Sequence, residues 1–208
     1  MIDNNQIYIL DNIIPPQYQK YLFKAITEDS TWVLNPTTST FPNLITSPDS
    51  NIINQINENF QFINTKFVNE TTPQYPSNTL PISPILHYVQ SYFNYSFHYN
   101  LTKLKINLQT SLPNNSPNTF NIPHIDNSSF TPYTYTLIYY ANDSDGDTII
   151  FNEKFENSPI KNFSIYKKIT PKKGRVIIFP TNTVHCGSHP TKSISRIVIN
   201  INFEITPN

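Results

Sequence analysis

The spacing of apolar residues in the second half of the chain constrains the fold most strongly. In segment 196–205 Ile and Phe occupy one alternating face, and this period of two predicts a β-strand. Five more segments after residue 100 are rich in Ile, Val, Tyr, Phe and Thr and are separated by turn residues: 104–108, 134–140, 147–151, 163–169 and 175–180. These segments predict an antiparallel barrel or double sheet.

The first hundred residues carry apolar side chains at helical spacing instead. Pro15 suits a first helical position, and the residues after it predict a helix that ends near Glu28. We expect a second helix from Asp49 or Ser50 to Ile63 and a third that begins at Ser83. Short strands are expected at 6–10 and 32–34, and turn-rich connectors at 35–48 and 71–81.

Together these patterns predict one α+β domain, mainly β, that spans residues 1–208. Residues 1–100 are expected to form mostly helical support on one face, and residues 101–208 the β core. A chain of 208 residues is long enough to bury one substantial core. The helices are amphipathic and need a sheet to cover their apolar faces, so a single domain is expected.

Composition and charge argue against several kinds of partner. The formal charge is zero, with 14 basic and 14 acidic residues scattered singly, so no nucleic-acid partner is expected. No apolar run is long enough to cross a bilayer, and the acidic start of the chain does not resemble a signal peptide. The lone Cys186 excludes an internal disulfide and fits a reducing, cytoplasmic location. The sequence leaves the oligomeric state open.

The triplet His124-Ile125-Asp126, with His185 far downstream, is a candidate metal site. On an extended backbone the side chains of His124 and Asp126 point to the same side. Two imidazoles and one carboxylate can hold one face of a ferrous ion and leave the other face open. The alternative is a His–Asp pair at a surface turn, since five His residues make such a triplet common by chance. The other His residues are interpreted as structural or surface groups.

Arg196 is a candidate for binding the distal carboxylate of a co-substrate. It lies eleven residues after His185, on the mixed face of the last strand, and an Arg can bind a carboxylate through two parallel hydrogen bonds. That face can point to solvent or to a polar cavity, and the sequence leaves both open. Thr136, Ile138 and Tyr140 share one side of another strand, where Tyr140 could complete the carboxylate site and Ile138 could wall the carbon chain. The alternative is a half-buried aromatic strand.

The second half of the chain resembles the 2-oxoglutarate and iron(II)-dependent dioxygenases, in particular the prolyl 4-hydroxylase-like branch. The ordered blocks that carry the resemblance are 123–126, 137–143, 145–151, 169–180, His185 and Arg196. The resemblance implies a double-stranded β-helix, or jelly roll. It implies iron held by His124, Asp126 and His185, and 2-oxoglutarate held by Arg196 and Tyr140. It also implies O2 as a reactant and ascorbate as a supporting reductant.

The chain departs from the family pattern at two places. A Tyr often found about ten residues before the His-x-Asp triplet is missing from segment 114–117, which could weaken co-substrate affinity. The frequent Gly-Gly before the acidic residue is Asp145-Gly146 here. The Asn-rich composition resembles small phage members of the family, which would imply the host cytoplasm as the location of the protein.

The resemblance leaves the substrate open. A prolyl residue in a peptide or protein is the favoured substrate, and a free amino acid or other small metabolite is the alternative. Halogenation is not expected, because Asp126 is retained where halogenating relatives carry a small residue. Repair of alkylated nucleic acid is not expected, because Asn202 stands where those relatives carry a second Arg. Two non-enzymatic alternatives are a jelly-roll binding module and a structural role in a virion or assembly.

Overall fold

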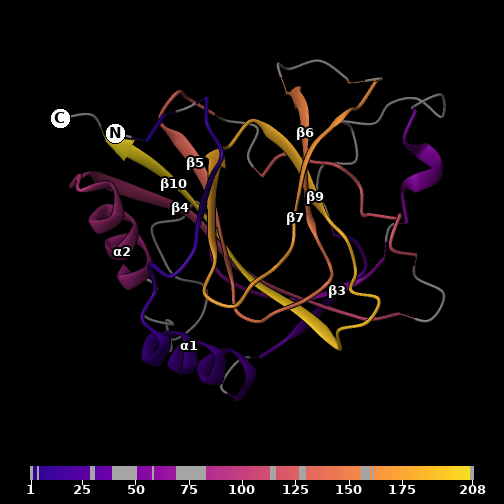
Figure 1. Ribbon diagram of the computed structural model, residues 1–208, viewed down its shortest axis with the longest axis horizontal. Coiled ribbons are helices and arrows are strands. Elements are labelled where there is room, and N and C mark those ends of the chain that lie inside the picture. Colours follow the sequence, from indigo (N-terminus) through magenta and orange to yellow (C-terminus); the bar gives the residue numbers. More distant parts are fainter. Residues whose placement is uncertain are drawn as a thin grey trace.

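Two antiparallel β-sheets form the body of the protein in the computed structural model (Figure 1). The structure describes residues 2–3, 5–28, 31–38, 51–57, 59–68, 83–112, 116–126, 130–155, 160 and 162–206, with residues 65–68 described by their backbone only. The larger sheet has seven strands, in the order β1 (Tyr8–Leu10), β8 (Val176–Pro180), β5 (Thr134–Tyr140), β10 (Ser195–Thr206), β4 (His98–Thr110), β3 (Gln61–Val68) and β2 (Val33–Asn35). The smaller sheet has three, in the order β7 (Ile165–Ile169), β6 (Thr148–Lys154) and β9 (Thr183–Gly187).

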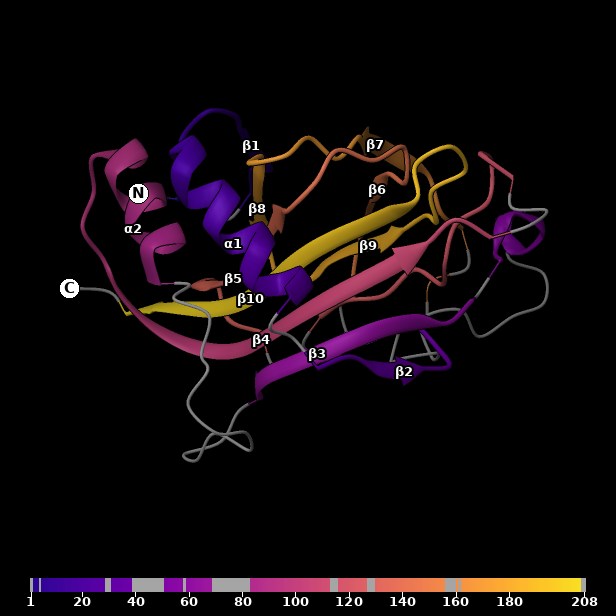
Figure 2. The ribbon, with the colours of Figure 1, turned by 90° about the horizontal axis from the view of Figure 1, so that it is seen from below.

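The expectation of a mainly β protein with α-helices on one face is confirmed. Helices α1 (Pro16–Glu28) and α2 (Ser83–Phe93) lie on the same side of the larger sheet (Figure 2). Leu22 and Ile26 of α1 and Ile85 of α2 are buried in one cluster with the apolar face of β10. The alternating Ile and Phe residues of the last strand therefore point into the layer under the helices, as their period of two predicts.

One expected helix is wrong. The segment from Asp49 to Ile63 was expected to be helical, but its described part holds only a 3-10 turn at Ile53–Gln55 and the beginning of β3. Strand β3 pairs antiparallel with β4 from Phe62 to Val68, so hydrogen bonds to a neighbouring strand replace those of a helix. β-Branched and aromatic residues suit both patterns in a short segment, and tertiary pairing decides between them. The described part of the first hundred residues thus contributes β1, β2, β3 and the start of β4 as well as helices α1 and α2.

The longest pairing, between β4 and β10, sets which polar residues face each other. Its register places Gln109 opposite Arg196 and Lys105 opposite Asn200. A bulge follows at Asn202/Phe203. Apolar and polar residues alternate along both strands, so the helix side of the pair is apolar and the other side carries the polar residues.

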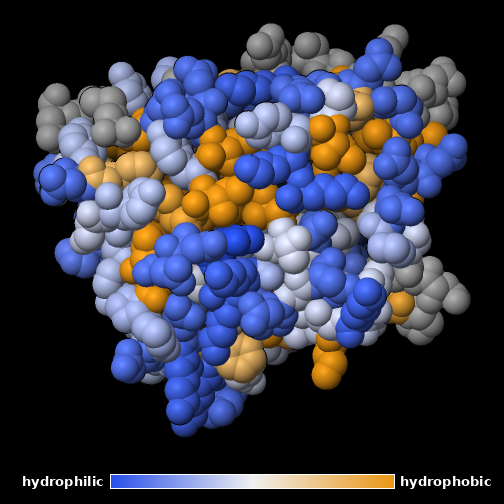
Figure 3. Space-filling model, viewed as in Figure 1, coloured by the Kyte–Doolittle hydropathy of each residue, from blue (hydrophilic) through white to orange (hydrophobic). Residues whose placement is uncertain are grey.

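The two sheets pack against each other through the faces that the helices do not cover. Ile138 and Ile177 of the larger sheet share a buried cluster with Ile150 of the smaller one. The surface seen in Figure 3 has polar margins and a band of apolar residues across its middle. Among the described residues, the helices are too short and too polar to span a bilayer. Connector 71–81 and most of connector 35–48 lie outside the described residues.

Candidate active site

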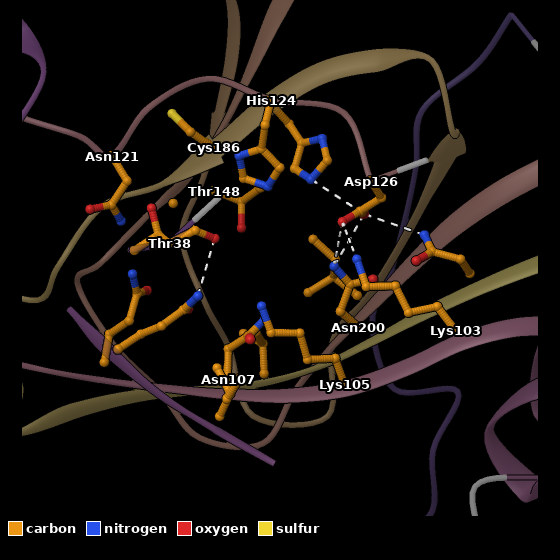
Figure 4. A pocket seen from close by; sticks show the side chains of 18 of the residues that line it. Thr38, Lys103, Lys105, Asn107, Asn121, His124, Asp126, Thr148, Cys186 and Asn200 are labelled. Carbon is orange, nitrogen blue, oxygen red and sulfur yellow. Dashed lines mark hydrogen bonds and ion pairs between the residues drawn. The ribbon is translucent and has the colours of Figure 1, made fainter. Parts of the chain in front are cut away.

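A cavity of about 370 Å³ opens between the two sheets (Figure 4). Strands β3, β4, β5 and β10 of the larger sheet, strands β6 and β9 of the smaller sheet and segment 121–126 supply most of its walls. The volume falls at the lower end of the range for small-molecule sites. The polar faces of β4 and β10 meet here, so the mixed face of the last strand points to a polar cavity.

His124, Asp126 and His185 meet at one wall of this cavity. One possible ligand atom from each residue can be chosen so that all three lie within 4.8 Å of one another. The Nε2 of His185 is 3.5 Å from an oxygen of Asp126. Residues His124 and His185 form an isolated antiparallel bridge, in which each backbone N–H donates to the other's carbonyl at 2.9 Å. This pair of backbone hydrogen bonds brings the 121–126 segment to β9.

Both histidine rings are oriented by a backbone carbonyl two residues earlier in the chain. The Nδ1 of His124 lies 3.0 Å from the carbonyl of Ile122, and the Nδ1 of His185 lies 3.0 Å from the carbonyl of Thr183. A carbonyl can only accept, so each Nδ1 carries a proton, and in the neutral form of the ring Nε2 keeps a free lone pair. Burial and the neighbouring His185 lower the pKa of His124 to about 3, which keeps that ring neutral near pH 7. Fixing the tautomer in this way is typical of metal-binding histidines.

Asp126 is buried and held by side-chain donors. The Asn200 amide donates to both carboxylate oxygens at 3.1 Å, and the Thr136 hydroxyl donates to one at 3.1 Å. The Asn202 amide adds a bond of 3.3 Å, and the ammonium of Lys103 lies 3.7 Å away. Burial by itself would raise the pKa of Asp126, but the charge of Lys103 and the Asn200 bond help to hold it below its ordinary value. The carboxylate is therefore ionised at neutral pH.

These residues fit a ferrous ion. Two imidazoles and one ionised carboxylate converge from one side, and all three residues border the cavity. A 2-His-1-carboxylate set with open positions is the arrangement that suits non-haem Fe(II). The polar network behind Asp126 fixes the carboxylate in the way that supporting residues orient metal ligands.

Arg196 lies in the same cavity, with only 4% of its surface exposed. Its Nε donates to the carbonyl of Gly146 at 2.8 Å, its Nη1 to the side-chain oxygen of Gln109 at 3.1 Å, and its Nη2 to the hydroxyl of Thr148 at 2.7 Å. A guanidinium has five N–H donors, so further donors remain for a ligand. Within the described part of the chain Arg196 forms no ion pair with a carboxylate. A buried cation of this kind fits an anionic ligand.

Gly146 leaves the space that this arginine needs. A Cβ atom at position 146 would lie 2.6 Å from the carbonyl oxygen of Ser188 and 3.0 Å from the Cδ of Arg196. Both separations are shorter than a van der Waals contact, and the first is to rigid backbone. The Gly in Asp145-Gly146 therefore allows β10 and the loop before β6 to approach closely.

The three residues expected to accompany Arg196 occupy different positions. Ile138 borders the cavity. Tyr140 lies behind it: its hydroxyl donates to Thr148 at 2.7 Å, and its ring centroid is 5.9 Å from the Arg196 guanidinium carbon. Burial raises the pKa of Tyr140 to about 12, so the hydroxyl keeps its proton. Thr136 donates to Asp126 and so lies at the candidate metal end, away from Arg196.

Several polar residues of the cavity were not predicted from the sequence. Thr148 accepts from both Arg196 and Tyr140, which leaves its own proton to donate. Lys105 and Asn107 also border the cavity, and Asn121 lies beside the segment of the triad. The period of two along β4 places Lys103, Lys105 and Asn107 on one face, but a solvent-facing strand has the same pattern. The sequence therefore shows that these polar residues share one face of β4, but it does not show that this face points into a cavity.

Comparison with known proteins finds one family model that matches part of the chain. Residues 111–204 match the model of the 2OG-Fe(II) oxygenase superfamily. No curated protein matches the sequence at a significant level. The match covers 94 of the 208 residues, and solved structures with low sequence identity share the fold.

Three solved structures illustrate the shared fold. An oxidoreductase of the 2OG-Fe(II) oxygenase family from Burkholderia pseudomallei is 12% identical, with a TM-score of 0.60 over 95% of this chain and 84% of that one. The non-haem α-ketoglutarate-dependent epimerase SnoN from nogalamycin biosynthesis is 12% identical, with a TM-score of 0.59 over 97% of this chain and 78% of the epimerase. A prolyl hydroxylase from Trichoplax adhaerens, in complex with a peptide fragment, is 16% identical, with a TM-score of 0.55 over 96% of this chain and 84% of the hydroxylase.

Proposed function

We propose that this chain is an Fe(II)- and 2-oxoglutarate-dependent oxygenase that hydroxylates an unactivated C–H bond. The observation that carries the proposal is the convergence of His124, Asp126 and His185 within 4.8 Å on a cavity that also contains the buried Arg196. One site thus offers three ligands for a metal and one cation for a distal carboxylate. The family model over residues 111–204 supports the same chemistry.

The chain's own residues would bind and orient the reactants. His124, Asp126 and His185 would hold the iron, and Arg196 would bind the distal carboxylate of 2-oxoglutarate with help from the Thr148 hydroxyl. Tyr140 would support that site from behind by fixing Thr148, and Ile138 would wall the carbon chain. When bound, iron and 2-oxoglutarate supply an oxidation by O2 that yields succinate, carbon dioxide and the hydroxylated product. Ascorbate would keep the iron reduced.

The proposal includes a double-stranded β-helix as the scaffold of a single domain that spans residues 1–208. Strands β4, β10, β5 and β8 of the larger sheet and strands β7, β6 and β9 of the smaller sheet are all antiparallel. The cavity lies between the two sheets, where a jelly roll holds its ligands. Strands from both sheets then position the ligands of one site.

A prolyl residue in a peptide is the first substrate to test, because a prolyl hydroxylase shares the fold. A free amino acid or another small metabolite is the second candidate. The size of the cavity, about 370 Å³, favours this candidate because 2-oxoglutarate must also fit inside. Neither candidate requires a nucleic acid or a membrane, and we propose that the enzyme works in the cytoplasm.

The test is substrate-dependent formation of succinate with Fe(II), 2-oxoglutarate and air, with and without ascorbate. The panel contains prolyl peptides, free amino acids and nucleosides. Replacing the ligand in Asp126→Ala should abolish succinate formation, whereas the exposed Glu28→Ala should leave it intact. Full activity in Asp126→Ala would remove this residue from the site.

Anaerobic titration separates the enzyme from a binding module without catalysis. Fe(II) together with 2-oxoglutarate should produce a weak visible charge-transfer band in the wild-type protein and none in Asp126→Ala. A wild-type protein that takes up neither ligand would favour the module or a structural role in an assembly.

A further inference from the structure

We propose that the substrate is a small molecule with a free carboxylate, and that Lys105 binds this carboxylate inside the cavity. The inference rests on the proposed function and goes beyond it by naming the substrate's charge and the residue that recognises it. It follows from the charges on the cavity wall, from the lack of partners for its polar groups and from the position of Lys105.

The charges on the described part of the cavity wall do not balance. Asp126 is its only acid, whereas Lys103, Lys105 and Arg196 are all cations. Arg196 would balance the distal carboxylate of 2-oxoglutarate. Asp126 and the other carboxylate of 2-oxoglutarate would balance the two charges of Fe(II). The two lysines then remain as two excess positive charges, and a substrate carboxylate would neutralise one of them.

The two lysines differ in their surroundings. Lys103 is 3.7 Å from Asp126 and so belongs to the candidate metal end. Among the described residues, the ammonium of Lys105 has neither a hydrogen-bond partner nor an ion pair. Burial and, to a smaller extent, the charge of Lys103 lower the pKa of Lys105 to about 8, against the opposing charge of Asp126. A cation that loses hydration and has no partner within the described part of the chain is better explained by a ligand than by a role in stability.

Lys105 is placed to reach a substrate bound near the iron. It projects from β4 between Lys103, two residues before it at the metal end, and Gln109, four residues after it at the Arg196 end. Figure 4 shows Lys105 and Asn107 on one side of the open space and His124 on the other. A carboxylate on Lys105 would therefore leave the rest of a small molecule facing the candidate metal site.

Two amides of the cavity wall also have side-chain atoms without a hydrogen bond to the described residues. The side-chain oxygen of Asn107 and both polar side-chain atoms of Asn121 are buried without a hydrogen bond, and both residues line the cavity. Asn121 is only 1% exposed. Buried polar groups are rarely left unpaired in folded proteins, so these amides fit the polar groups of a ligand. An amino or hydroxyl group next to the substrate's carboxylate could donate to Asn107 while the carboxylate binds Lys105.

The first experiment measures binding without turnover. Protein labelled with 13C at the lysine ε-carbons is loaded with Zn(II), a diamagnetic substitute for iron, and with 2-oxoglutarate, and is titrated with acetate, or with acetamide as the uncharged probe. We expect acetate to shift the Lys105 signal saturably and acetamide to leave it in place. Lys105→Met identifies the signal by its loss, and the exposed Lys167→Met is the matched control. A Lys105 signal that does not respond to acetate, or responds equally to acetamide, overturns the inference.

Stability and co-substrate affinity exclude the other roles for Lys105. Lys105→Met should unfold at the same or a higher temperature, because it removes a charge without a partner. Its affinity for 2-oxoglutarate should remain within about twofold of wild type. A lower unfolding temperature would show a structural partner, and a tenfold loss of 2-oxoglutarate affinity would assign Lys105 to the co-substrate. Either result overturns the inference.

Turnover assays identify the substrate class. We expect free amino acids or hydroxy acids to stimulate succinate formation and the matching amides, such as L-prolinamide beside L-proline, not to. Lys105→Met should lower kcat/KM for the active acid at least tenfold, mainly through KM, and Lys105→Arg should restore part of it. Equal turnover of a prolyl peptide by wild type and Lys105→Met overturns the inference. Failure of the wild-type protein to bind Mn(II) and 2-oxoglutarate would instead count against the proposed function.

Discussion

At the scale of single residues, the candidate site is held from behind by hydrogen bonds. Asp126 accepts from Asn200, Asn202 and Thr136, so its carboxylate has little freedom to turn. Arg196 donates three hydrogen bonds to protein acceptors, and its remaining N–H groups can donate to a ligand in the cavity. Groups fixed in this way lose little conformational entropy on binding, which favours both affinity and orientation.

Replacing Arg196 should therefore weaken 2-oxoglutarate binding strongly. Arg196→Met removes the cation, and truncating one partner of a buried charge pair costs about 2–5 kcal/mol, or roughly 30-fold or more in affinity. Arg196→Lys keeps the charge but loses the paired N–H donors that bind a carboxylate through two hydrogen bonds, so we expect an intermediate affinity for 2-oxoglutarate. Titration of the Mn(II)-loaded protein with 2-oxoglutarate measures both. Wild-type affinity in Arg196→Met would show that another residue binds the distal carboxylate.

At this scale the sequence predicted residues with a distinctive chemical type. His124, Asp126, His185 and Arg196 were singled out by type and order, and the structure brings them to one cavity. Lys105 was not singled out, because a lysine on an alternating strand is usually exposed. Only the register between β4 and β10, and the smaller sheet that faces them, show that it points inward.

At the scale of elements, the end of α2 shows how local geometry fixes a boundary. Asn94 follows the last helical residue with φ 46°, and the N–H of Tyr95 donates to the carbonyl of Gln90 at 3.1 Å. A residue in the left-handed region that closes a helix in this way is usually Gly or Asn. The helix therefore stops here and the chain turns toward β4.

Asn94→Ala should destabilise the protein, since the left-handed conformation is unfavourable for Ala by about 1 kcal/mol or more. For a domain of this size that corresponds to a fall in Tm of roughly 2–4 °C. Asn94→Gly is the matched control, because Gly adopts the conformation freely, and its Tm should equal or exceed that of wild type. Thermal unfolding followed by circular dichroism measures all three proteins. Equal losses in both variants would show that the Asn side chain, and not the backbone, matters.

A second link between elements depends on pH. Two nitrogens of Arg175, just before β8, donate to the two oxygens of Asp11, just after β1, at 2.8 Å each. The Arg175 bonds hold the pKa of Asp11 below its ordinary value, against a smaller opposing effect of burial. A carboxyl with a lowered pKa stabilises the fold above the pKa of the unfolded chain. That contribution is lost as the pH falls through the lower, folded value.

Asp11→Asn should thus lower stability at pH 7 by about 1 kcal/mol, and the difference from wild type should shrink below about pH 4. Glu28→Gln is the control, because the Lys24–Glu28 pair at 3.6 Å is exposed and adds little. Urea unfolding between pH 3 and pH 7 gives the comparison. A difference that stays constant down to pH 3 would mean that the ion pair is not the cause.

The strands and both α-helices were largely predictable, whereas the expected helix over 49–63 was not. The period of two in β5 and β10 persists over many residues, so pattern alone identifies these strands. Segment 49–63 has Ile and Phe at positions that suit a helix as well as a strand. The partner that decides the outcome is β4, some 40 residues away in sequence, and no local pattern reports it.

At the scale of the whole molecule, the candidate metal site joins segments that are distant in sequence. His124 and Asp126 belong to a segment with few regular hydrogen bonds, and His185 belongs to β9 of the smaller sheet. Asp126 is in turn bonded to β10 of the larger sheet. A metal bound to all three would join β9 to segment 121–126, which is hydrogen-bonded to β10 through Asp126, so binding the metal should also stabilise the fold.

Metal binding should therefore raise the unfolding temperature of the wild-type protein. A ligand at a hundred times its Kd adds about 2.7 kcal/mol, which corresponds to a rise in Tm of roughly 5–10 °C at this size. His185→Ala should lose this rise. His189→Ala should keep it, because His189 is equally buried but lies outside the triad, with its Nδ1 3.1 Å from the carbonyl of Thr110. Thermal scans with Mn(II), and again after removal of the metal by EDTA, make the comparison. A rise of equal size in both variants would place the metal elsewhere, whereas its loss in His185→Ala alone would tie the stability of both sheets to the three converging side chains.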